Sequence, residues 1–107
     1  MLYKELTVEL LNPLSAGDFP AQAFSYTGTA GSTDGWAAGP EGVMVWSDTA
    51  CYVAVGEGVT ATTSDTPIPA NTPIPFKVPL NTSGVWRVSA IQVSTGGNMY
   101  CKPINTR

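Results

Sequence analysis

Residues 85–104 of this chain read VWRVSAIQVSTGGNMYCKPI, and this stretch decides the fold class. β-Branched and apolar residues dominate residues 85–93, which is typical of a strand. The TGGN sequence at residues 95–98 supplies the glycines that a tight turn with positive φ requires. Residues 98–104 then resume strand character. The stretch therefore predicts two strands joined as an antiparallel hairpin.

Shorter stretches of the same kind recur along the chain and are separated by turn residues. Between residues 12 and 107 no stretch shows the apolar period of an amphipathic helix. The expected strands are residues 2–11, 21–29, 43–47, 50–55, 76–80, 85–93 and 98–104, with 59–63 as an edge strand or extended loop. Seven or eight short strands in 107 residues predict a single all-β domain, residues 1–107, folded as an antiparallel β-sandwich or jelly roll.

The first 20 residues are expected to form either a first strand with a loop or an N-terminal arm. Residues 2–11 alternate with the period of a half-buried strand. The apolar residues on one face of that strand are Leu2, Leu6, Val8 and Leu10. Three of the four also have the i, i+4 spacing of a short helix. We favour the strand because the segment ends at an Asn-Pro pair and lacks a helical capping box.

The tetrapeptide Thr-Pro-Ile-Pro occurs twice, at residues 66–69 and 72–75. Proline at every second position removes the N–H donors that a sheet ladder needs. We therefore expect an extended stretch that lies along an edge or surface as a stiff connection between strands. A proline-rich ligand for another domain is the alternative.

The composition argues against an enzyme. The chain has no histidine, and charged residues make up 12% of it, against roughly 25% in ordinary domains. Serine or cysteine nucleophiles would lack a histidine base. The eight acidic residues are spread along the chain, and their spacing favours neither a catalytic pair nor a metal site. We therefore expect no catalysis, cofactor or metal.

The charge and hydropathy patterns exclude two classes of partner. The formal net charge is −3, and the five basic residues are scattered, so no basic footprint for nucleic acid is present. No apolar run approaches the roughly 20 residues that span a bilayer. The N-terminus lacks the pattern of a signal peptide, and we expect the protein to be made in the cytosol and not secreted.

Cys51 and Cys101 both lie within apolar strand-like runs. Two buried free thiols are the favoured interpretation, because buried cysteine behaves as a small hydrophobic residue. A disulfide between neighbouring strands is the alternative.

The three tryptophans differ in their surroundings. Trp36 lies in a Gly-, Ser- and Asp-rich segment, residues 30–42, that is expected to be a long exposed loop. Its small neighbours offer little to bury it, so we expect an interface or ligand-binding role. Trp46 and Trp86 are expected to pack in the core, with Trp46 as a second candidate for ligand stacking.

The stretch from Val43 to Ile104 resembles a group of small virion proteins of tailed bacteriophages. The resemblance lies in DTACYVAVG at 48–56, AT at 61–62, PA at 69–70, VSAI at 88–91 and TGGNMY at 95–100. It implies a capsid decoration (cement) protein with a β-sandwich or jelly-roll fold. Such a protein would be made in the host cytoplasm and assembled as a homotrimer on the capsid exterior, with the major capsid protein as its partner. The resemblance assigns no binding residue.

Three functions follow as hypotheses. The first is the capsid decoration protein, in which residues 2–11, with Leu2, Tyr3 and Leu6, or the 30–42 loop would contact neighbouring subunits. The second is a tail, neck or fibre component of the virion. The third is a carbohydrate-binding module that would hold a cell-surface glycan on Trp36 and Trp46.

Overall fold

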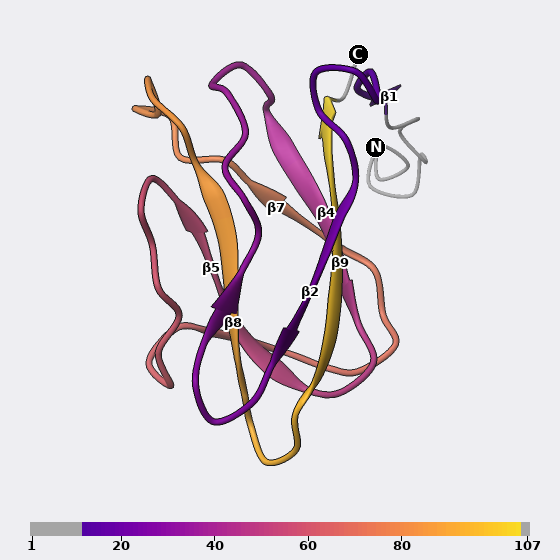
Figure 1. The fold of residues 1–107 in the computed structure, drawn as a ribbon, viewed down its shortest axis with the longest axis vertical. Coiled ribbons are helices and arrows are strands. Elements are labelled where there is room, and N and C mark those ends of the chain that lie inside the picture. The colour runs from indigo at the N-terminus through magenta and orange to yellow at the C-terminus, as the bar shows by residue number, and fades with distance from the viewer. Residues whose placement is uncertain (1–11, 106–107) are drawn as a thin grey trace, which may run out of the picture.

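The computed structural model describes residues 12–105, which form two antiparallel sheets (Figure 1). Sheet A contains β1 (Asn12–Pro13), β2 (Gln22–Tyr26), β4 (Gly42–Ser47), β7 (Ile74–Lys77) and β9 (Gly97–Asn105). Sheet B contains β3 (Gly31–Ser32), β5 (Cys51–Gly56), β6 (Thr66–Ile68) and β8 (Arg87–Gln92). The predicted all-β sandwich is confirmed. Nine strands lie in the described residues, two of them only two residues long.

The pairing of the strands is that of a jelly roll. β2 pairs with β9, β3 with β8, β4 with β7, and β5 with β6, always antiparallel. These pairs are nested, as in one long hairpin, and the hairpin is rolled up so that β9 also pairs with β4 and β8 with β5. Sheet A therefore has the order β1-β9-β4-β7, with β2 also on β9, and sheet B has the order β3-β8-β5-β6.

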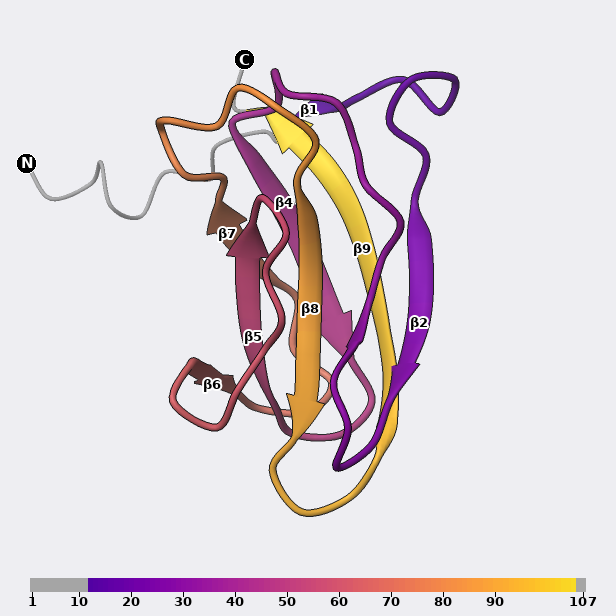
Figure 2. The ribbon, with the colours of Figure 1, turned by 60° about the vertical axis from the view of Figure 1, so that its left-hand side comes forward.

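The predicted hairpin of residues 85–104 is wrong in its pairing, although both strands exist. β8 lies in sheet B and β9 in sheet A, so the connection between them crosses from one sheet to the other. Figure 2 shows β5 and β8 in one layer, with β4 and β9 in the layer behind. The glycine turn reverses the direction of the chain, but it does not determine which strand β8 or β9 pairs with. Both strands have a strongly apolar face, and facing each other across the core buries both faces.

The core between the two sheets is built from the inward faces of the strands. Strand alternation places Val43 and Val45 of β4 and Met99 of β9 inside, with none of their surface exposed. Val88 and Val53 approach from sheet B. Tyr26 is buried beside them, and its hydroxyl bonds the carbonyl of Thr49 at 2.8 Å. No helix in the described residues is long and apolar enough to cross a membrane.

The two Thr-Pro-Ile-Pro repeats lie at the same open side of the sandwich. The first contributes β6, the edge of sheet B, and the second leads into β7, the edge of sheet A. The Val78 amide donates to the Glu41 carbonyl at 3.0 Å. In an antiparallel pair, backbone groups of alternate residues point toward and away from the partner strand. Because Val78 bonds toward β4, the backbone groups of Pro75 and Lys77 point away from β4. Pro75 has no N–H, so Lys77 carries the only outward donor of β7, and the edge is a poor template for another strand.

Candidate functional site

The outer surface of sheet A carries an exposed aromatic pair, Trp46 of β4 and Tyr100 of β9. The two residues face each other in register, and their ring centroids are 5.1 Å apart at an interplanar angle of 36°. Trp46 is 38% exposed and Tyr100 42% exposed. The neighbours of Tyr100 in the strand, Met99 and Cys101, point inward, so the alternation of β9 sends the ring outward.

Small and flexible side chains surround this pair. Ala23 of β2 is opposite Tyr100 in the register, and Met44 precedes Trp46 on the same face of β4. A shallow, open pocket of about 320 Å³ lies between these strands and is lined mainly by apolar atoms. We call Ala23, Met44, Trp46 and Tyr100 the aromatic face. Aromatic side chains and methionine are the residues enriched in protein interfaces.

Two polar side chains that line this pocket, Lys102 and Gln22, have hydrogen-bond partners elsewhere in the molecule. The Lys102 ammonium donates hydrogen bonds to the carbonyls of Leu14 and Phe19, the latter at 2.7 Å, and holds that loop against sheet A. The side-chain oxygen of Gln22 accepts the Asp34 amide at 2.7 Å. Within the described residues, the indole N–H of Trp46 and the hydroxyl of Tyr100 themselves make no hydrogen bond.

Trp36 is not exposed, and the expectation that it lies on an exposed loop is wrong. It is 2% exposed and packs against Trp86, with centroids 4.9 Å apart. The two residues exchange backbone hydrogen bonds at 2.9 and 3.0 Å. Their indole N–H groups donate to the carbonyls of Pro20 and Ala37, both at 2.9 Å. The small neighbours of Trp36 let the segment approach the sandwich closely, so distant residues bury the ring. A glycan platform of Trp36 and Trp46 cannot form.

Trp46 and Trp86 were both predicted to pack in the core, and the prediction holds for only one of them. Trp86 is fully buried in the core, as predicted. Trp46 lies at the surface and not in the core. Tyr100 was missed by the sequence analysis, and the signal that could have found it is its position between two apolar residues of a strand. Leu2, Tyr3 and Leu6 lie outside the described residues.

Cys51 and Cys101 are free and buried, and they enter the core from opposite sheets. Burial raises the pKa of both thiols, most strongly that of Cys101, where the nearby Cys51 adds to the effect. A thiol held in its neutral form is a poor nucleophile.

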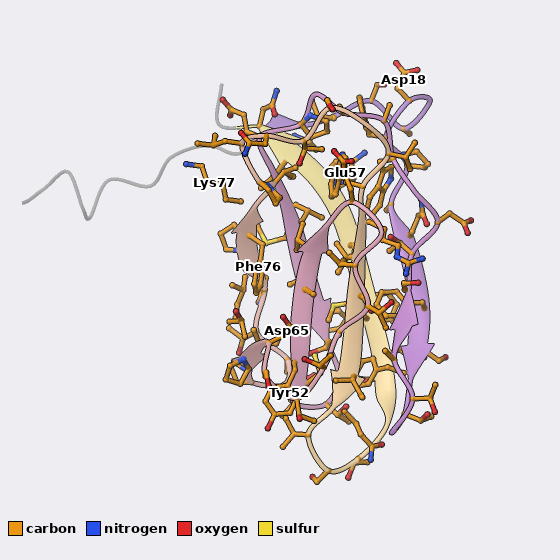
Figure 3. All side chains as sticks on the ribbon, turned by 90° about the vertical axis from the view of Figure 1, so that its left-hand side faces the viewer. Asp18, Tyr52, Glu57, Asp65, Phe76 and Lys77 are labelled. Carbon is orange, nitrogen blue, oxygen red and sulfur yellow. The ribbon has the colours of Figure 1, made fainter. Side chains whose placement is uncertain are left out.

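Several of the carboxylates fix turns. Asp48 accepts the Asn98 amide at 2.7 Å and the Asn98 side chain at 3.2 Å, and these bonds lower its pKa. Glu57 accepts the Ser83 and Gly84 amides, which lowers its pKa as well. Figure 3 shows Glu57 and Asp65 well apart. Within residues 12–105 no group of three or more His, Cys, Asp and Glu residues could hold a metal ion.

Comparisons with known proteins give no relative: no family model matches the chain, and searches of curated proteins and of solved structures found no significant match.

Proposed function

We propose that this chain is a non-enzymatic structural module that binds a protein lattice through the aromatic face, and that the lattice is the capsid of a tailed bacteriophage. The observation that carries the proposal is the exposed Trp46–Tyr100 pair on an apolar sheet surface. Tryptophan and tyrosine are the residues most often found as energetic anchors of protein interfaces.

The jelly-roll topology supports a role on a viral capsid by analogy. Jelly rolls occur in viral capsid proteins and in lectin domains. A fold alone does not establish a function, so the analogy shows only that a capsid or lectin role is compatible with this topology. The resemblance of Val43–Ile104 to small virion proteins favours the capsid.

The protein would bind the capsid through many copies of one small contact, made by the aromatic face. The aromatic face is modest in area, so each contact with a capsid subunit would be weak. A homotrimer would present three such faces to a lattice of repeating sites, and linked binding events strengthen one another through effective concentration. Bridging adjacent capsid subunits in this way would stabilise the shell.

Co-sedimentation with empty capsids of the encoding virus tests this proposal. We expect the protein to saturate the capsids, and Trp46→Ala to weaken binding by about 30-fold, the effect of losing an anchor worth about 2 kcal/mol. Val93→Ala is the matched control because Val93 is 45% exposed and lies outside the aromatic face. Unchanged binding by Trp46→Ala would overturn the role of the aromatic face. Binding to tails and not to capsids would favour a tail, neck or fibre component.

A carbohydrate-binding module is the second candidate, because an exposed aromatic pair can stack on a sugar ring. Sugar recognition also needs hydrogen-bonding groups, and the indole N–H of Trp46 and the hydroxyl of Tyr100 would supply them at this surface. A glycan titration followed by tryptophan fluorescence distinguishes sugar binding from capsid binding. A saturable change that Trp46→Ala abolishes would favour this candidate over the capsid.

A further inference from the structure

A second apolar surface lies at the open side of the sandwich, away from the aromatic face. It is a groove of about 790 Å³ between the segment from Gly39 to Gly42, the end of β9 and the chain from Pro75 to Leu80. Phe76, Val78 and Ile104 contribute its apolar floor, and Leu80 stands at its rim with 85% of its surface exposed. We call this the edge groove. Figure 3 shows Phe76 and Lys77 at this edge.

The edge groove favours an occupant that binds through side chains. The free side of β7 offers the Lys77 amide, but the flanking Pro73, Pro75 and Pro79 have no N–H. A strand could therefore make very few backbone hydrogen bonds there. Apolar side chains on the floor would have to provide most of the binding free energy.

The start of the described chain lies next to the edge groove. Asn12 is opposite Asn105 in the register of β1 and β9. Asn105 itself lines the groove, and its side-chain oxygen accepts the Glu41 amide at 2.8 Å. The chain before Asn12 therefore leaves the sandwich at the end where the groove opens.

The eleven residues that precede Asn12 are long enough to cross the molecule and carry a suitable apolar pattern. An extended run of residues 2–11 covers about 33 Å at about 3.3 Å per residue, which is comparable to the 32 Å middle dimension of the molecule. Leu6, Val8 and Leu10 fall on one face of that run.

We propose that residues 2–11 of the same molecule dock in the edge groove, with Leu6, Val8 and Leu10 on its apolar floor and the alternate residues, including Glu5 and Glu9, facing away from it. The short connection gives the segment a local concentration in the millimolar range, above that of a second copy in dilute solution. Docking would cover apolar surface that the two sheets leave open. This inference concerns a different surface from the aromatic face and does not depend on the proposed function.

Amide hydrogen exchange of the full-length chain tests the proposal. The test variant is Leu6→Ser/Val8→Ser/Leu10→Ser, and the control is Tyr3→Ser/Thr7→Ser on the opposite face of the segment. We expect the Lys77 and Leu80 amides to exchange about tenfold faster in the test variant than in the unmodified protein, equivalent to about 1.4 kcal/mol. The control should leave both rates unchanged. Unchanged β9 amides show that the sandwich remains folded.

Two outcomes would overturn the proposal. Equal Lys77 exchange in the unmodified protein and the test variant would show that the segment does not occupy the groove. Protection that rises with protein concentration, together with a dimer or trimer in sedimentation, would show that the occupant comes from another copy. Protection that does not change with protein concentration, at concentrations on both sides of any association seen in sedimentation, supports docking within one molecule.

Discussion

At the scale of single residues, this sandwich depends on polar side chains that fasten one turn to another. Asp48 follows β4, and its carboxylate binds the amide and the side chain of Asn98 at the start of β9. Gly97 directly precedes Asn98, and a Cβ at this position would collide with the Asp48 and Thr49 side chains. The end of the sandwich where the chain crosses between the sheets is therefore held by a charge-assisted contact.

The lowered pKa of Asp48 predicts a specific dependence of stability on pH. A carboxyl group with a lower pKa in the folded state stabilises the protein above its unfolded pKa, and this contribution is lost as the pH falls through the folded pKa. We expect the melting temperature to fall below about pH 4. Asp48→Asn should melt lower near neutral pH and show a shallower acid loss. Thermal unfolding of both proteins between neutral and acidic pH measures this, and parallel curves would contradict it.

Trp36 and Trp46 should respond to substitution in opposite ways. Trp36→Ala removes a buried ring from its contact with Trp86 and leaves a cavity, so we expect a loss of about 3–5 kcal/mol in the free energy of unfolding. Trp46→Ala removes a surface contact with Tyr100 and should cost about 1 kcal/mol. Urea unfolding of both variants compares them. A smaller cost for Trp36→Ala than for Trp46→Ala would contradict the assignment of core and surface.

At the scale of strands, the proline-bearing edges keep the open side of the sandwich unpaired. Proline in an edge strand lowers the tendency to pair with another chain. We expect Pro75→Thr to restore an outward N–H on β7 and to promote self-association. Pro69→Thr is the control, because Pro69 is exposed and lies after the end of β6. Light scattering over a range of concentrations measures this, and a Pro75→Thr protein that associates no more than the unmodified protein would show that proline is not what blocks the edge.

Strand positions could be predicted from the sequence to a useful degree, but strand partners could not. The alternation in residues 85–93 and 98–104 identified β8 and β9. Their placement in different sheets depends on burial across the core, which involves residues far apart in the chain. Residues 59–63 form no strand, and β3 is too short to show a period. The edge position of the proline repeats was predicted correctly, because a missing N–H is a local property, but the repeats form β6 and the start of β7 and not a connection between strands.

At the scale of the whole molecule, the two sheets enclose both cysteines, so the thiols report on opening of the sandwich. Cys51 and Cys101 are buried, and burial raises their pKa values. We expect neither thiol to react with a disulfide reagent in the native protein and both to react in denaturant. Rapid reaction of either thiol under native conditions would contradict the enclosed core, and the absence of reactive thiols in denaturant would indicate a disulfide.

The candidate site was predicted only in part, because exposure is a property of the whole fold. The composition around Trp36 suggested a solvent-exposed ring, yet Pro20 and Trp86, which are distant in the chain, contact and enclose it. The apolar neighbours of Trp46 suggested burial, yet the pleat of β4 turns the ring outward. The pairing of Trp46 with Tyr100 depends on the register of β4 and β9, which no local pattern contains.

Radical footprinting of the protein on capsids tests the central claim most directly, because it reads the exposure of Trp46 and Tyr100 in the bound state. We predict that oxidation of both side chains falls severalfold on binding, as expected for anchors at the centre of an interface. Oxidation of exposed Val93 should stay the same. Bound protein in which Trp46 and Tyr100 oxidise as fast as in the free protein would contradict the account.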